Sequence, residues 1–436
     1  MDNTTIGIIA VAVTLILIAL RFPIGVVLGL VSIAGIAELT NMRIAWGVVS
    51  ATPFDFIGQW ELTAAPMFLF MGYLATEGKL TSGLFSALRL FLARLPGGLA
   101  ISSVGACTFF AAASGSSVAT AAAMSRIAVP EMLSNGYDKG LATGTIAASG
   151  TLGSLIPPSV LLILYGVYAQ VSVGQLFMAG FIPGLVSALL YAMMIMVRVK
   201  ANPGLAGAVV VSATRAEKLA ALKEIWPLPT LILLVLGGIF TGYFSPTEAG
   251  ALGAFFALCI AMLRRSLDFA GFKAAVVNTL QSTAAIFLIL IGSVLFTKFL
   301  AMSRLPTAFS EMILSVSDSQ WWILFAVALI YLVLGMLIDS IGLLLLTLPL
   351  ILPLVDAAGI DAIWFGIIVI KLLEVGLVTP PIGLNVYVIK GALGNIVTLP
   401  EVFRGVSWFI AMDFLALLLI VLIPAMSLWL PSLVYN

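Results

Sequence analysis

The chain has 436 residues, of which 62% are hydrophobic and only 9% are charged. This composition excludes a soluble globular protein and predicts an all-α integral membrane protein that crosses the lipid bilayer several times. The net charge of +1 argues against nucleic acid as a partner, and the lack of histidine removes the commonest general base and metal ligand.

The first part of the chain alternates between long apolar stretches and short polar corners. Between the third and fourth predicted spans, residues 78–94 carry basic side chains among Leu and Phe at helical spacing, which predicts an amphipathic helix lying along the membrane interface. The spans predicted in the first half are residues 5–20, 24–39, 62–76, 140–170 and 173–198.

An apolar run over residues 97–129 is interrupted by the polar sequence Ser-Gly-Ser-Ser at 114–117. Each limb has roughly 12–16 residues, or about 18–24 Å of helix, whereas the hydrocarbon core of a bilayer is about 30 Å thick. We therefore expect a re-entrant helical hairpin here, with the four polar residues at its tip.

Adjacent prolines, Pro157 and Pro158, interrupt the span predicted at residues 140–170, shortly after Gly153. A proline removes a backbone donor and clashes with the preceding turn, so the pair is expected to break the helix. In lipid, broken backbone is stable only where protein or a hydrated cavity satisfies its polar groups. The break therefore predicts a binding site near the middle of the membrane.

Residues 199–226 form the only long polar segment and are predicted to be a cytoplasmic linker, after which the same pattern restarts. A second hairpin is expected over residues 321–354, with Asp339 and Ser340 at its tip. A second broken helix is expected at about 361–390, where Gly376 precedes the adjacent prolines Pro380 and Pro381. The remaining predicted spans are residues 227–242, 246–263, 278–297 and 405–430.

A single ungapped shift of 223 residues relates the two halves, 1–198 and 227–436. Each half holds five crossings and a hairpin, and an odd number of crossings places the second copy upside down, so inverted repeats are predicted. The shift superimposes Pro23 on Pro246, Pro130 on Pro353, Gly136 on Gly359, Asp138 on Asp361, Gly153 on Gly376, Pro157 on Pro380 and Pro158 on Pro381.

The basic residues indicate the orientation of this arrangement in the membrane. Sixteen of them fall on one side, while Arg43, Lys298 and Arg304 fall on the other. Basic residues of membrane proteins accumulate on the cytoplasmic side, so the side with sixteen is predicted to be cytoplasmic. Both termini are then predicted to be periplasmic. The first hairpin then enters the membrane from the cytoplasm, and the second enters from the opposite face.

Two hairpins that meet two broken helices would bring several helix ends together at mid-depth. Helix N-termini favour a carboxylate, while unwound carbonyls and hydroxyls suit a hard cation such as sodium. We assign Ser117, Ser154, Asp339, Ser340 and Thr379 to sodium, and Ser114, Ser116, Ser159, Arg304 and Asn385 to an organic anion.

Each of these candidates also has a purely structural interpretation. Asp339 is costly within a re-entrant segment unless it pairs with a cation or proton, but it could simply cap the hairpin turn. Glu374 is either a functional carboxylate or a buried partner of Lys371, three residues earlier. The serines could serve helix packing, and Arg304 could extend to the interface.

Four motifs in combination resemble the large membrane (M) subunit of TRAP transporters, the tripartite ATP-independent periplasmic systems. They lie at residues 114–120, 144–166, 244–250 and 376–385, and the resemblance extends over essentially the whole chain. It implies sodium-driven uptake of an organic acid, such as sialic acid or a C4-dicarboxylate, by an elevator mechanism in the bacterial inner membrane. The implied partners are a soluble periplasmic binding protein and a small four-span membrane subunit, expected to be a separate protein here.

Three other functions fit the residues less well. A stand-alone sodium–anion symporter of similar hairpin architecture would need no binding protein. An intramembrane hydrolase would need a base to activate Ser116 or Ser117, and the sequence offers no histidine for this role. A channel is disfavoured because opposed hairpins would occlude its pore. We therefore predict a transporter subunit that is not an enzyme.

Overall fold

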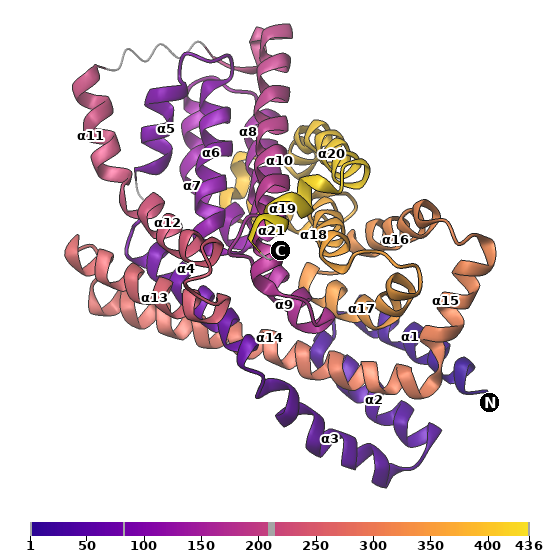
Figure 1. Ribbon diagram of the computed structural model, residues 1–436. Helices are drawn as coiled ribbons and strands as arrows, with labels where there is room; N and C mark the ends of the chain where they lie inside the picture. The colour runs from indigo at the N-terminus through magenta and orange to yellow at the C-terminus, as the bar shows by residue number, and fades with distance from the viewer. Residues whose placement is uncertain (1, 82, 208–213, 435–436) are drawn as a thin grey trace.

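The computed structural model describes residues 2–81, 83–207 and 214–434, which form α-helices and short 3-10 helices without any β-strand (Figure 1). This confirms the predicted all-helical class. The helices up to the middle of the chain are α1 (Asn3–Ala19), α2 (Ile24–Leu39), α3 (Met42–Ile57), α4 (Ala64–Glu77), α5 (Leu84–Leu92), α6 (Gly98–Ser114), α7 (Ser117–Ser134), α8 (Lys139–Thr151), α9 (Val160–Ala169) and α10 (Val173–Ala201).

The rest of the chain contains α11 to α21, and the longest of these, α14, runs across the lower part of Figure 1. Their bounds are α11 (Arg215–Ile225), α12 (Pro227–Phe240), α13 (Pro246–Leu263), α14 (Phe269–Ser303), α15 (Leu305–Val316), α16 (Gln320–Gly335), α17 (Ser340–Ala357), α18 (Ala362–Val378), α19 (Leu384–Leu393), α20 (Leu399–Leu422) and α21 (Ala425–Val434).

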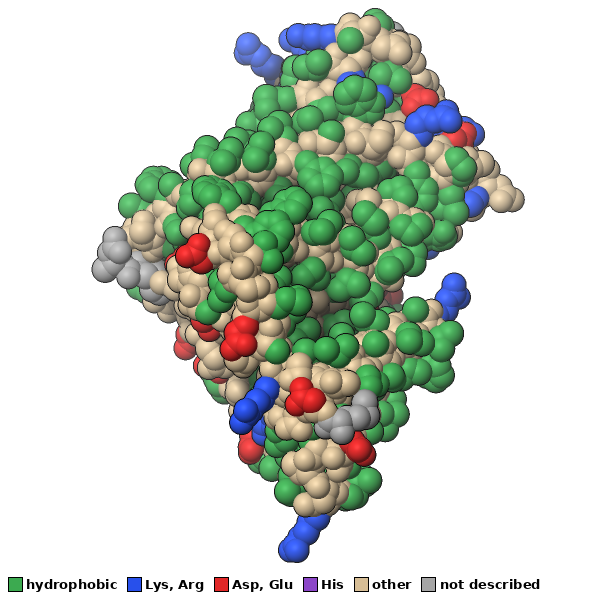
Figure 2. Space-filling model, turned by 90° about the vertical axis from the view of Figure 1, so that its right-hand side faces the viewer, with side chains coloured by type: hydrophobic (Ala, Val, Ile, Leu, Met, Phe, Trp, Pro, Cys, Tyr) green, Lys and Arg blue, Asp and Glu red, His purple; other side chains and the backbone are tan. Residues whose placement is uncertain are grey.

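Five of the described helices, α10, α13, α14, α17 and α20, are long and apolar enough to cross a membrane. The pair α11 and α12, bent by 49°, gives a sixth if it forms one span. Hydrophobic side chains cover most of the upper part of the face in Figure 2, below a rim where Lys and Arg gather. Exposed apolar side chains on this scale are typical of a surface that contacts lipid, as predicted for a membrane protein.

Several predicted boundaries were wrong. Helix α14 has 35 residues instead of the 20 expected at 278–297, because the polar residues that flank its apolar centre continue the helix without an interrupting proline. Helix α3 was not predicted, since Arg43 and Asp55 break up its apolar pattern. The interfacial helix begins at Leu84 instead of residue 78, because Gly83 adopts a positive φ. The last span begins earlier, at Leu399, and ends at Leu422.

The polar segment between the halves is partly helical. Helix α10 continues to Ala201 and stops just before Pro203, which cannot continue a helix. Thr214 then caps α11 through a reciprocal pair of hydrogen bonds with Glu217. Within the predicted linker, residues 208–213 lie outside the described residues.

The first hairpin is formed by α6 and α7, whose 17 and 18 residues exceed the 12–16 predicted for each limb. The second limb is longer because α7 continues through Pro130 to Ser134. At about 26 Å each, both limbs are still shorter than a hydrocarbon core of about 30 Å. The second hairpin consists of α16 and α17.

Helices α8 and α18 lie at the centre of the molecule. Every residue from Leu141 to Thr151 in α8 is buried, as is every residue from Trp364 to Val378 in α18. Each of these helices is followed by two adjacent prolines joined by a cis peptide bond. These are Pro157–Pro158 after α8 and Pro380–Pro381 after α18. The two predicted helix breaks are therefore present, and α9 and α19 follow them.

Candidate functional site

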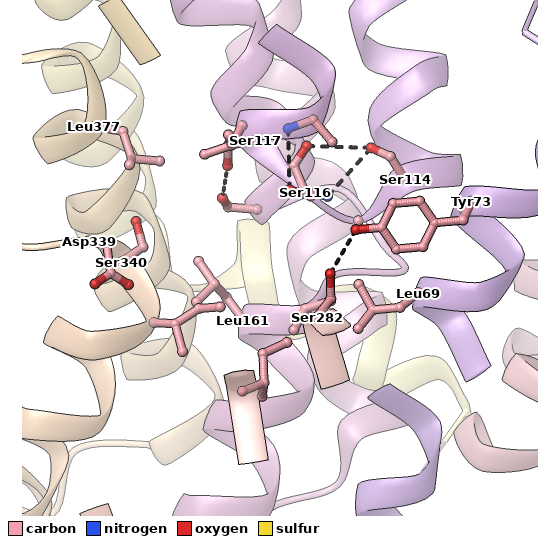
Figure 3. Close-up of a pocket in the computed structure, with 18 of the residues that line it drawn as sticks. Leu69, Tyr73, Ser114, Ser116, Ser117, Leu161, Ser282, Asp339, Ser340 and Leu377 are labelled. Atoms are coloured by element: carbon pink, nitrogen blue, oxygen red, sulfur yellow. Dashed lines mark hydrogen bonds between the residues drawn. The ribbon is translucent and has the colours of Figure 1, made fainter. Parts of the chain in front are cut away.

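A cavity of about 390 Å³ lies where the two hairpin tips approach each other. Both tips contribute polar side chains to it, and the break after α8 contributes Ser154. Figure 3 shows Asp339 and Ser340 on one side of the cavity and Tyr73 on the other. The lining residues labelled in Figure 3 are Leu69, Tyr73, Ser114, Ser116, Ser117, Leu161, Ser282, Asp339, Ser340 and Leu377.

The first tip presents the N-terminus of α7 to the cavity. Gly115 has a φ of +60°, which lets the chain turn sharply between α6 and α7. The Ser116 hydroxyl accepts a hydrogen bond from the backbone N–H of Ala119 at 3.4 Å, as an N-cap does. The Ser114 hydroxyl lies 3.0 Å from that of Thr120. The positive end of the α7 dipole therefore faces a cleft lined with hydroxyls.

The break after α8 packs directly on this tip. The hydroxyls of Ser117 and Ser154 are hydrogen-bonded to each other, so α7 is tied to the segment that precedes the adjacent prolines. Ser159 is fully buried, and its hydroxyl donates to the carbonyl of Ser154 at 2.5 Å. Ser159 therefore holds the broken backbone together and is not among the residues that line the cavity.

The second tip presents the N-terminus of α17. The Asp339 carboxylate accepts a hydrogen bond from the N–H of Gly342 at 3.0 Å, so the predicted capping interaction is present. Asp339 also lines the cavity, and it is the only carboxylate among the described lining residues. The hydroxyl of Ser340 is buried and has no hydrogen-bond partner among the described residues. Both side chains are thus available to a bound ion or substrate.

Besides Ser159, three predicted site residues lie outside this cavity. The Thr379 hydroxyl donates to the carbonyl of Val375 at 2.6 Å. Asn385 is fully buried, and its amide donates to the carbonyl of Ala147 at 3.2 Å. Arg304 is exposed between α14 and α15. The second break, from Gly376 to Pro381, contributes only Leu377 to the cavity wall.

The structure adds three polar lining residues that the sequence did not indicate, Tyr73, Thr76 and Ser282. The Thr76 hydroxyl donates to the carbonyl of Gly72 at 2.9 Å. The hydroxyl of Tyr73 on α4 lies 2.7 Å from that of Ser282 on α14, and both face the first tip (Figure 3). Tyr73 is the one tyrosine within an otherwise apolar predicted span, which was an available signal. Ser282 gave none, because its partner is 209 residues away in the sequence.

A charged cluster lies fully buried close to the cavity. The ammonium of Lys371 donates to Glu374 at 3.0 Å, so the second of the two interpretations of Glu374, a buried pair with Lys371, is present. The same ammonium donates to Asp413 on α20 at 2.7 Å, and the hydroxyl of Tyr191 on α10 donates to the same carboxylate. Asp413 was missed, although a lone acidic residue within the last apolar span was a visible signal.

Comparisons with known proteins identify the family. The family model described as "Tripartite ATP-independent periplasmic transporter, DctM component" matches residues 11–426. The chain is 33% identical to the C4-dicarboxylate TRAP transporter large permease protein DctM of Vibrio cholerae, with 94% of each chain covered. It is 32% identical to the sialic acid TRAP transporter large permease protein SiaM of the same organism, with 86% of this chain and 87% of that one covered.

Two further similarities complete the comparison. The isethionate TRAP transporter permease protein DctMQ of Oleidesulfovibrio alaskensis is 32% identical over 93% of this chain, but the chain spans only 63% of that relative. The crystal structure of the YdaH transporter of Alcanivorax borkumensis has a similar fold, with a TM-score of 0.63 over 90% of this chain and 89% of that one, at 13% identity. The chain belongs to the family of large membrane subunits, the DctM component, of tripartite ATP-independent periplasmic transporters.

Proposed function

We propose that this chain is the permease through which an organic acid enters the cell, in symport with sodium. The observation that carries this proposal is the meeting of two helix N-termini, those of α7 and α17, at one cavity. Its volume of about 390 Å³ is within the range that small ligands occupy. The relatives named above are permeases for C4-dicarboxylate, sialic acid and isethionate, which are all small organic anions.

The electrostatics of the cavity favour an anion that binds through hydrogen bonds. None of the described lining residues is Lys or Arg, so no side-chain cation attracts the anion there. The α7 and α17 N-termini supply positive potential and unpaired N–H groups instead. Ser114 and Ser116 add hydroxyl donors beside the first of these termini. We assign the organic anion to the part of the cavity beside the N-terminus of α7.

Sodium is assigned to the oxygens around the two tips. The Ser340 hydroxyl lacks a partner, and Asp339 provides a negative charge beside it. Ser117 and Ser154 bring two further hydroxyls together across the first tip. A membrane potential of 100 mV contributes about 2.3 kcal/mol for each sodium charge that crosses, so coupling to two or more ions would concentrate an anion strongly.

The helix bounds support inverted repeats and an elevator mechanism. A shift of 223 residues carries α7 onto α17 residue for residue, and it carries one cis proline pair onto the other. The odd number of crossings in each half then inverts the second copy and leaves both termini in the periplasm. The two hairpins and the two broken helices would move as one body and carry the cavity across the inner membrane.

The binding partners follow from the family. A soluble periplasmic protein would deliver the acid, and a small four-span membrane subunit would complete the permease. The longer relative DctMQ supports this second partner, because this chain accounts for only 63% of its length. No part of the proposed reaction makes or breaks a covalent bond, so the chain would not act as an enzyme.

Reconstitution tests this function. Proteoliposomes that contain the chain and its small subunit, supplied with the binding protein, are expected to accumulate a labelled organic acid when sodium is outside. Replacement of sodium by choline should abolish accumulation. Uptake by the chain alone, without the binding protein and the small subunit, would instead support a stand-alone sodium–anion symporter.

A further inference from the structure

The charged cluster formed by Lys371, Glu374, Asp413 and Tyr191 has a role that packing alone does not explain. It joins three helices, since Lys371 and Glu374 belong to α18, Asp413 to α20 and Tyr191 to α10. All four side chains are 0% exposed. The cluster also lies close to the cavity, because Glu374 is one helical turn before Leu377, which lines it.

The formal charges of this cluster do not balance. It contains one ammonium, two carboxylates and the neutral hydroxyl of Tyr191, so it has a net charge of −1 if the ammonium and both carboxylates are ionised. An uncompensated buried charge is strongly destabilising, and the penalty is largest inside a membrane. The cluster therefore needs one additional positive charge.

The hydrogen bonds indicate where that positive charge resides. One oxygen of Asp413, Oδ1, accepts hydrogen bonds from both Lys371 and Tyr191, an arrangement that stabilises an ionised carboxylate. Glu374 accepts a single, longer hydrogen bond from Lys371 through Oε2. Each carboxylate leaves its other oxygen, Oε1 of Glu374 and Oδ2 of Asp413, buried and without a partner among the described residues. The two groups therefore differ in their donors, two for Asp413 and one for Glu374. A proton bound to Glu374 would remove the excess charge at the less stabilised carboxylate.

The first half of the chain has neutral residues at the positions that correspond to this cluster. The shift of 223 residues places Ala148, Thr151 and Leu190 at the positions of Lys371, Glu374 and Asp413. All three are buried, and the hydroxyl of Thr151 donates to the carbonyl of Ala148 at 2.7 Å. The repeat-related positions are thus buried once as neutral residues and once as three ionisable ones.

Other ionisable groups on the helices packed against α18 are directed elsewhere. From α8, only the neutral hydroxyl of Thr151 faces Tyr191. Tyr331 on α16 accepts a hydrogen bond from Thr347, and Tyr165 on α9 donates to the carbonyl of Ala362. The remaining groups either have partners of their own or are exposed. Those with partners are Lys139 with Glu401, Lys390 with the carbonyls of Gly394 and Val397, Arg198 over the ring of Trp408, and Tyr168 with Thr297. The exposed ones are Lys200, Asp356, Tyr387 and Arg404.

We propose that Glu374 holds a resident proton at neutral pH, which makes the cluster of Lys371, Glu374, Asp413 and Tyr191 electrically neutral. The step is protonation of a carboxylate oxygen by a solvent proton, with no other bond made or broken. A neutral cluster lets α18 remain buried beside the cavity whether or not the cavity is occupied. This site is distinct from the sodium and anion sites, and it does not depend on the proposed transport reaction.

Infrared spectroscopy of the purified chain in nanodiscs tests this assignment directly. The wild-type spectrum minus that of Glu374→Gln is expected to contain the carbonyl band of one protonated carboxylic acid at neutral pH, which shifts in heavy water. Asp413→Asn should abolish the band, because Lys371 then has a single carboxylate to neutralise and Glu374 ionises. The matched control Asp356→Asn, at an exposed carboxylate, should leave the band unchanged.

A measurement on the wild-type chain guards against variants that fail to fold. Its carboxylic-acid band should disappear as the pH is raised above neutral. Thermal stability should fall as the pH rises toward that point and then level off, because only the folded chain holds the proton in that range. No such band in the wild-type chain at neutral pH would overturn the proposal. A band that appears only when sodium is replaced by choline would also overturn it, because sodium would then be the missing positive charge.

Discussion

The hydroxyl of Ser117, the first residue of α7, is hydrogen-bonded to the hydroxyl of Ser154 in the break that follows α8. This contact joins the tip of the first hairpin to the unwound backbone across 37 residues of sequence. The candidate sodium ligands of the first half therefore form one unit.

This contact predicts the outcome of a double-mutant cycle. Ser117→Ala and Ser154→Ala should each raise the sodium concentration needed for half-maximal uptake about tenfold. The double variant should be little worse than either single one, because both remove the same interaction. Thr108→Ala is the control, since its hydroxyl bonds to the carbonyl of Val104 within α6. Fully additive effects would show that the two serines act separately.

The turn at the first tip predicts a loss of stability in Gly115→Ala. A side chain there is strained at a φ of +60°, and its Cβ would lie 2.8 Å from the carbonyl oxygen of Pro158. We expect a destabilisation of about 1–3 kcal/mol, measured as a lower thermal midpoint. Gly391→Ala in α19 is the control, because a Cβ there meets nothing within 4 Å. Equal midpoints for the two variants would contradict the close packing of the tip.

The buried charged cluster predicts a severe effect of Lys371→Met. Removal of the ammonium leaves the buried carboxylate of Asp413 without its cationic partner and takes the hydrogen bond from Glu374, at a cost of about 3–5 kcal/mol. Introducing Glu374→Gln and Asp413→Asn together with Lys371→Met should recover much of this loss. Thermal unfolding measures both effects, and the exposed Lys273→Met is the control. If Lys371→Met alone were as stable as Lys273→Met, the assigned role of the ammonium in the cluster would be wrong.

The pair on the far wall of the cavity predicts a milder effect. Tyr73→Phe keeps the ring but removes the hydrogen bond to Ser282, which is expected to cost about 1 kcal/mol. Because both hydroxyls line the cavity, the KM for the organic acid should rise a few-fold. Tyr243→Phe, at a ring that is 82% exposed, should leave the KM unchanged. An unaltered KM in Tyr73→Phe would place the anion away from this wall.

The sequence predicted those parts of the fold that depend on local chemistry. Apolar stretches located most helices, and adjacent prolines located both breaks, because their effects act within one or two turns. It placed the boundaries of α14 poorly, since a helix also continues through polar residues where nothing terminates it. Helix α3, with its mixed polar and apolar sequence, was missed for a related reason.

The site could be predicted only in part. Ser114, Ser116, Ser117, Ser154, Asp339 and Ser340 do line one cavity, as expected from their positions at tips and at a break. Ser159 and Thr379 instead bond to nearby backbone carbonyls, a competition that residue type does not reveal. Asp413 stands out as a lone acidic residue in an apolar span, but its pairing with Lys371 depends on contact between distant helices, which spacing along the chain does not reveal.

The assignment of sodium to the second tip is tested most directly by Asp339→Asn. Asparagine also caps helix N-termini, so α17 should still form while the charge is lost. Uptake by proteoliposomes with the small subunit and the binding protein should be measured against external sodium, with the exposed Asp356→Asn as control. In Asp339→Asn, we expect the sodium concentration needed for half-maximal uptake to rise at least tenfold. In the control it should not change. A sodium dependence identical to that of the wild-type chain would contradict the assignment of sodium to this tip.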